Sequence, residues 1–121
     1  MTLLARLLTA VFLVMVAGCA MTPAEVAATD PIRRIPIKTD IGKLTDCLMP
    51  RLENLAGPWT ASHRTEGQRT TFRIHGGGDL GTIAVAVVEE GMATIHISSN
   101  ILTPDALAGT IEQQILACRA P

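Results

Sequence analysis

Apolar residues recur every three or four positions between residues 41 and 55. They are Ile41, Leu44, Leu48, Leu52 and Leu55. This spacing predicts an amphipathic helix, and Thr39 and Asp40 before it are residue types that cap helix N-termini. Pro50 lies inside the pattern and lacks a backbone N–H, so we expect a kink there, or a restart of the helix with Pro50 in its first turn.

A second helix is predicted at the C-terminal end of the chain. Its apolar stripe consists of Leu107, Ile111, Ile115 and Cys118. Thr103 suits the N-cap and Pro104 the first helical position. Leu102, just before the cap, is placed to pack on Leu107 as a hydrophobic staple.

Between the two predicted helices, over residues 58–99, the hydrophobic pattern changes to alternation, which is typical of β-strands. Turn residues divide this segment at three points. Glu66-Gly67 and Gly78-Asp79 suit two-residue turns, and Glu89-Glu90-Gly91 suits a three-residue loop closed by glycine. The pattern therefore predicts a meander of four antiparallel strands.

These turns fix a register that assigns each side chain to one sheet face. The register places opposite each other Ala61 and Phe72, Ile74 and Ile83, and Val85 and Ile95. The apolar face then consists of Trp59, Ala61, Phe72, Ile74, Ile83, Val85, Val87, Ala93, Ile95 and Ile97. The polar face carries Thr60, Ser62, Arg64, Arg69, Thr71, Arg73, His75, Thr82, Ala84, Ala86, Thr94, His96 and Ser98.

The predicted fold class is α+β: an N-terminal helix, a four-stranded antiparallel meander and a C-terminal helix, with both helices on one sheet face. These elements form a single domain over residues 40–121. Residues 19–39 are rich in proline and small residues and lack a sustained apolar period, which predicts a tether. Within them, Ile32 to Lys38 is also compatible with a strand at a sheet edge, where Pro36 is tolerated.

The N-terminal end of the chain has the layout of a secretory signal peptide. Arg6 precedes a run of about ten residues, Leu7 to Val16, that is interrupted only by Thr9. A membrane-spanning helix needs ~20 apolar residues. A retained anchor helix is therefore the less favoured alternative.

Val16-Ala17-Gly18-Cys19 resembles the lipobox of bacterial lipoproteins, in which a cysteine directly follows two small residues. The resemblance implies removal of residues 1–18, a lipid thioether on Cys19 and acylation of the new amino group. Several acyl chains make a stable anchor, because each buried CH₂ contributes ~0.8 kcal/mol. Ala20, where an aspartate would signal retention, implies sorting to the outer membrane, on the inner leaflet facing the periplasm.

The remainder of the chain is similar only loosely to short uncharacterised proteobacterial envelope lipoproteins, and this likeness implies no activity. Three cysteines are present. If lipidation consumes Cys19, then Cys47 and Cys118 remain as a pair in an oxidising compartment, and we predict a disulfide between them. Closing a loop of about 70 residues would stabilise the fold by ~4 kcal/mol. Two separately buried thiols are the alternative.

The first two strands of the polar face are basic. Arg64, Arg69, Arg73 and His75 are candidate anion-binding residues, because guanidinium groups pair well with phosphate and carboxylate. The predicted register puts Arg64 opposite Arg69, which is unfavourable unless an anion or a carboxylate lies between them. The alternative is a solvated face whose long side chains limit aggregation.

The sequence supports no catalytic residue, no cofactor and no metal site. It lacks a Gly-x-Ser-x-Gly motif, and residues 76–81, although rich in glycine, lack the Lys-Ser/Thr of a phosphate-binding loop and are predicted to form a hairpin tip. His75 and His96 are predicted on strands separated by a third, roughly 12 Å apart. The net charge of −1 and the scarcity of aromatic residues argue against nucleic-acid binding.

We therefore expect a membrane-anchored, periplasm-facing lipoprotein that acts by non-enzymatic contact, as an accessory or assembly subunit of a cell-envelope complex. Its partners would be the membrane, through the lipid on Cys19, and an envelope protein; a small-molecule ligand is not expected. The alternative is a binding module whose basic sheet face holds an anionic envelope ligand: a lipid headgroup, lipopolysaccharide or a cell-wall polymer.

Overall fold

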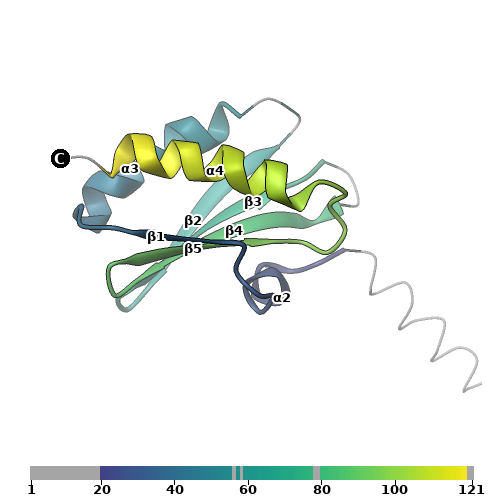
Figure 1. The fold of residues 1–121 in the computed structure, drawn as a ribbon, viewed down its shortest axis with the longest axis horizontal. Coiled ribbons are helices and arrows are strands. Elements are labelled where there is room, and N and C mark those ends of the chain that lie inside the picture. Colours follow the sequence, from purple (N-terminus) through teal and green to yellow (C-terminus); the bar gives the residue numbers. More distant parts are fainter. Residues whose placement is uncertain (1–19, 56, 58, 78–79, 120–121) are drawn as a thin grey trace, which may run out of the picture.

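The computed structural model describes residues 20–55, 57, 59–77 and 80–119, so the predicted signal peptide and Cys19 lie outside the described residues. The fold is α+β, with a five-stranded antiparallel sheet between two helical layers (Figure 1). The helices are α2 (Pro23–Ala27), α3 (Ile41–Glu53) and α4 (Pro104–Cys118). The strands, in the sheet order β1-β5-β4-β3-β2, are β1 (Arg33–Pro36), β5 (Met92–Ile97), β4 (Thr82–Glu89), β3 (Arg69–His75) and β2 (Thr60–Glu66).

Strand β1 extends the predicted meander at the β5 edge, so the predicted count of four strands is wrong. Ile35 lies opposite Ala93 and is 3% exposed. Pro36 is accommodated because β1 is an edge strand and needs no further partner for its backbone. Arg33 ties the strand to α4 through contacts with Asp105 at 2.8 Å and Glu112 at 3.4 Å. The sheet edge that the sequence allowed over residues 32–38 is confirmed.

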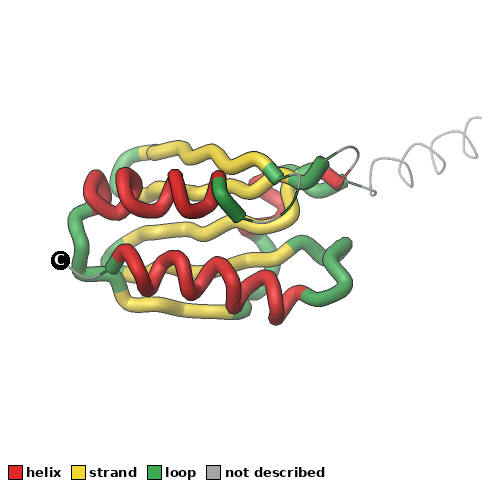
Figure 2. Tube along the Cα trace, turned by 90° about the horizontal axis from the view of Figure 1, so that it is seen from above, coloured by secondary structure: helices red, strands yellow, loops and turns green. Residues whose placement is uncertain are grey.

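Helices α3 and α4 lie side by side over one face of the sheet (Figure 2). Their apolar stripes face the sheet as predicted; the buried members are Leu44, Leu48 and Leu52 in α3, and Leu107, Ala108, Ile111, Ile115 and Cys118 in α4. Asp40 caps α3 by accepting hydrogen bonds from the backbone N–H groups of Gly42 and Lys43. The helix then runs through Pro50 as one element, so the alternative of a restart is wrong.

The predicted hydrophobic staple at the start of α4 is absent. Thr103 occupies the N-cap position, but its backbone (φ −124°, ψ 65°) is not in the usual extended conformation of a cap, and its side chain makes no capping hydrogen bond. The chain therefore enters the helix at a different angle. Leu102 is left 98% exposed instead of packing on Leu107.

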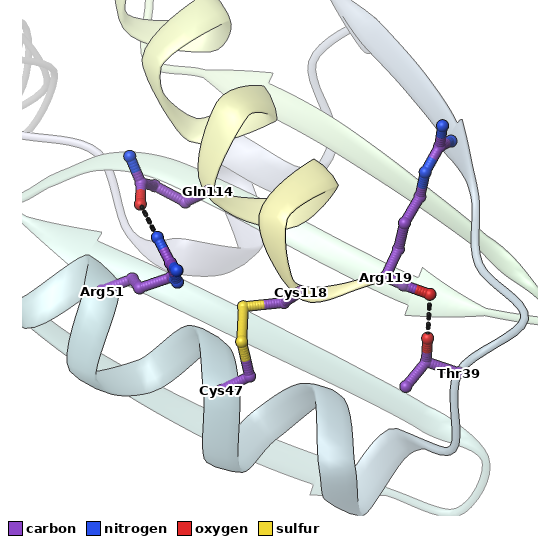
Figure 3. Close-up of a disulfide and its surroundings, with 6 residues drawn as sticks. All are labelled: Thr39, Cys47, Arg51, Gln114, Cys118 and Arg119. Carbon is purple, nitrogen blue, oxygen red and sulfur yellow. Dashed lines mark hydrogen bonds between the residues drawn. A yellow bond between two sulfur atoms is a disulfide. The ribbon is translucent and has the colours of Figure 1, made fainter. Parts of the chain in front are cut away.

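Cys47 and Cys118 form the predicted disulfide, which joins α3 to α4 with a Cα–Cα distance of 5.7 Å (Figure 3). Two weaker contacts support the same junction. The Thr39 hydroxyl donates to the backbone carbonyl of Arg119, and Arg51 donates to Gln114 at 3.4 Å. The bridge spans 71 residues and therefore encloses the whole sheet except β1.

Strand β5 pairs with β4 one residue out of the predicted register, so that Val85 lies opposite His96 rather than Ile95. The sequence predicted a three-residue loop, whereas the turn has two residues, Glu90 and Gly91, with φ of 52° and 74°. A glutamate at positive φ is uncommon. The residue pattern therefore does not reveal the shorter turn.

Strands β3 and β4 are offset by one residue as well, because Ile74 lies opposite Ala84 rather than Ile83. The register shifts between Ile74 and His75, and Ile83 still belongs to the core beneath α3 and α4. The predicted turn at residues 78–79 lies outside the described residues.

Because of the two offsets, most side chains of β4 lie on the sheet face opposite to the predicted one. The side chains of the neighbouring strands, β3 and β5, lie on the predicted faces. Ala84, Ala86 and Val88 pack in the core with α3 and α4, whereas Val85 and Val87 lie on the opposite face. Nearly all of β4 is buried. Because its apolar residues do not alternate with polar ones, the hydrophobic pattern could not fix its register.

The second face of β4 is covered by α2, which lies within the segment predicted as a tether. Val26 of α2 is fully buried against Val85 and Val87. Just before the helix, the backbone carbonyl of Met21 accepts a hydrogen bond from the N–H of Thr82 at 3.0 Å. Residues 20–36 thus pack on the domain through α2 and β1, because their few apolar side chains fill sites on the sheet.

Candidate anion-binding groove

A groove of about 390 Å³ lies between α2 and the outer face of β2 and β3. One wall is formed by α2 and the residue before it, and the other by arginines and their neighbours on the two strands. We call this site the arginine groove. Its lining residues are Thr22, Pro23, Ala24, Ala27, Arg64, Glu66, Arg69, Thr71 and Arg73.

Local sequence signals build the α2 wall. The Thr22 hydroxyl accepts from the N–H of Glu25 at 3.2 Å, and the Glu25 carboxylate accepts from the N–H of Thr22 at 3.3 Å. This is a capping box, with Pro23 at the first helical position. The Thr-Pro-x-Glu pattern is visible in the sequence and could have identified this helix, but a helix of five residues shows no apolar period.

The β2–β3 hairpin positions the arginines, and its register differs from the predicted one by two residues. The turn residues are Gly67 and Gln68, so Arg69 lies opposite Glu66, and Arg64 lies opposite Thr71. The predicted Arg64–Arg69 pair is therefore wrong. A shift of two residues keeps every side chain on its face, so the three arginines still share the outer surface of the sheet.

The groove carries excess positive charge. Three arginines against one glutamate leave two positive charges. Glu66 pairs with Arg64 at 2.8 Å, with both side chains about two-thirds exposed. Within the described part of the chain, Arg69 and Arg73 have no ion-pair partner, and the Nε of Arg73 is buried without a hydrogen-bond acceptor. Two groove arginines without carboxylate partners favour an anion supplied from outside the chain.

His75, the fourth candidate anion-binding residue, does not line the groove. Its Nε2 lies 3.4 Å from the Ser62 hydroxyl and its Nδ1 lies 3.2 Å from the Thr82 hydroxyl. Both ring nitrogens are thus engaged in a polar row that crosses β2, β3 and β4. The predicted anion-binding residues that line the groove are therefore Arg64, Arg69 and Arg73.

His96 has a structural position beneath the end of α2. Its Nδ1 donates to the backbone carbonyl of Thr29 at 2.8 Å, and its Nε2 lies 2.9 Å from the Thr94 hydroxyl. Among the residues described, no three His, Cys, Asp or Glu side chains come together as metal ligands would. A second hollow, of about 440 Å³ beside Cys47 and Gln114 on the opposite side of the molecule, is shallow and contains one arginine, Arg51.

In the described part of the chain, no helix has both the length and the apolar content needed to cross a membrane. A scan against family models, a search of curated proteins and a search of solved structures each found no significant match.

Proposed function

We propose that this chain is a lipid-anchored protein of the bacterial cell envelope that faces the periplasm, acts by non-enzymatic contact and binds an anionic group in the arginine groove. The lipobox-like residues ending at Cys19 support the anchor. One structural observation supports the ligand class: Arg69 and Arg73 converge on the groove without carboxylate partners among the described residues.

The guanidinium groups that line the groove suit phosphate or carboxylate oxygens. An arginine fork donates two parallel hydrogen bonds to either group, and the adjacent Thr71 adds a hydroxyl to the groove wall. In the envelope these oxygens belong to lipid headgroups, lipopolysaccharide and cell-wall polymers. The protein would then perform its accessory role by contact with such a ligand, or with a protein that presents a similar acidic group.

Replacing Arg69 and Arg73 together with glutamine is expected to weaken binding to the preferred probe about tenfold or more, because one charge-assisted hydrogen bond contributes about 1.5 kcal/mol or more. Cys19→Ser protein, purified without its signal residues, excludes binding through the lipid. Its cosedimentation with phosphatidylglycerol vesicles, lipopolysaccharide aggregates and cell-wall sacculi separates the three ligand sources. Binding should also fall as ionic strength rises from about 0.05 to about 0.5 M.

The matched control is the double replacement Arg51→Gln and Arg119→Gln. It removes the same charge from α3 and from the residue after α4, on the opposite side of the sheet from the groove. The proposal requires this control to retain binding. Equal losses in both double variants, or no binding of any of the three probes by the parent protein, would contradict it.

A further inference from the structure

The chain leaves the described domain at a fixed point on one end of the sheet. Met21 is held there by three contacts: its carbonyl accepts from the Thr82 N–H at 3.0 Å, and its sulfur lies 3.1 Å and 3.4 Å from the hydroxyls of Ser98 and Ser99. Ala20, the preceding residue, is exposed. The start of the described chain, at residues 20 and 21, is therefore held against the sheet.

Gly81 makes this close approach possible. Its φ is +66°, and a Cβ at this position would lie 2.9 Å from the Met21 carbonyl oxygen and 3.1 Å from the Ala20 Cβ. Any side chain there would push residues 20–21 away from the loop. The glycine thus allows the segment next to Cys19 to pack directly on the β3–β4 loop.

Two exposed leucines occupy the same end of the sheet. Leu80 adjoins Gly81 and is 45% exposed, and Leu102 follows the Ser98–Ser99 contact and is 98% exposed. These are the two most exposed large apolar side chains among the described residues. The loops that carry them lie beside the point where the chain enters the domain (Figure 1). We call Leu80 and Leu102 with their loops the leucine end.

We propose that the leucine end rests on the lipid bilayer, with Leu80 and Leu102 inserted among the lipids. This inference rests on the proposed lipid anchor at Cys19. Consecutive Cα atoms are ~3.8 Å apart. An acylated Cys19 would therefore be bonded to Ala20, close in space to the two loops that carry Leu80 and Leu102. With residues 20–21 packed on the sheet, no spacer separates the domain from the membrane, and the leucine end is the part that meets the bilayer.

The opposite arrangement makes a different prediction. If α2 and the residues around it left the sheet at the membrane, residues 20–32 would extend over roughly 40 Å, at ~3.3 Å per residue. The leucines would then stay in water. The contacts of Val26 and Met21 oppose this release, because it would expose a fully buried valine and break the Thr82 hydrogen bond.

Quenching by brominated acyl chains distinguishes these arrangements. Trp59 is the only tryptophan, so Trp59→Phe removes the native tryptophan emission. This background is used in the acylated full-length protein, bound to phosphatidylglycerol-containing vesicles. Leu102→Trp in this background should lose about half or more of its emission, because the proposal places residue 102 among the lipids. Gln68→Trp, in the exposed β2–β3 turn at the opposite end of the sheet, is the matched control and should keep its emission.

Vesicle flotation is measured on the same samples. Variants that float with the vesicles while Leu102→Trp stays unquenched would overturn the inference and leave the anchor standing. Acylation-dependent flotation that fails altogether would overturn both proposals. Leu80→Trp repeats the measurement at the second leucine, and an unchanged far-UV circular dichroism spectrum of each variant shows that the domain is folded. Quenching at both leucines but not at residue 68 supports the inference, and equal quenching at residue 68 would contradict it.

Discussion

Replacing Cys47 and Cys118 with alanine is expected to lower the free energy of unfolding by about 4 kcal/mol, because the bridge closes a loop of 71 residues. The effect is large for this domain, whose buried core is aliphatic apart from Phe72 and Cys118. Small domains have little stability in reserve. Urea unfolding followed by Trp59 fluorescence measures the change.

Reduction of the parent protein is the control for this double variant. Reduced parent and variant should unfold at nearly the same urea concentration, since both lack the cross-link and keep the rest of the core. A midpoint that does not move on reduction would show that the aliphatic core holds α3 and α4 together without the disulfide.

The second large effect is expected from Val26→Asp. It removes a fully buried side chain, whose burial contributes roughly 1.5–3 kcal/mol, and puts a carboxylate in its place against Val85 and Val87. A helix of five residues has no stability of its own. We therefore expect α2 to leave the sheet, with two readouts: faster hydrogen exchange at the Thr82 amide, and loss of anion binding, because the groove loses one wall.

Ala28→Asp is the matched control, because it adds the same charge at an exposed position next to α2. It should leave both readouts close to those of the parent. If Val26→Asp kept full anion binding while α2 was released, the α2 wall would have no part in the site, and the arginines alone would suffice.

Much of the helical layer could be predicted from the sequence. The apolar stripes of α3 and α4 have helical spacing, and a cysteine lies on or beside each stripe, so the disulfide follows from the pairing of two cysteines in helices that cover one sheet face. Leu102 shows the limit of such local patterns. The staple motif is present in the sequence, but the backbone of Thr103 turns the leucine away from the helix.

The register of β4 could not be predicted, because a strand buried on both faces has no polar positions to mark the solvent side. The turn conceals the offset, because the two-residue loop requires positive φ at Glu90 as well as at Gly91, and glutamate seldom adopts positive φ. Without that offset, Val85 and Val87 would have belonged to the core beneath α3. The other sheet face would then have lacked the two valines on which α2 packs.

The arginines of the candidate site were predicted by their alternation on β2 and β3, which survives a register shift of two residues. The groove itself was not. Its second wall comes from α2, which lies far from the arginines in sequence and within proline-rich residues that suggested a tether. The pocket depends on a tertiary contact made through Val26, and no local pattern encodes it.

The proposed lipid anchor on Cys19 would determine where the protein acts, which anions it meets and which end faces the bilayer. Intact mass of the protein purified from membranes, before and after reduction and alkylation, tests it most directly. We expect loss of residues 1–18, added acyl chains on Cys19 that are absent from a Cys19→Ser variant, and two thiols that appear only on reduction. An unmodified Cys19 with Cys47 and Cys118 already reactive would contradict it.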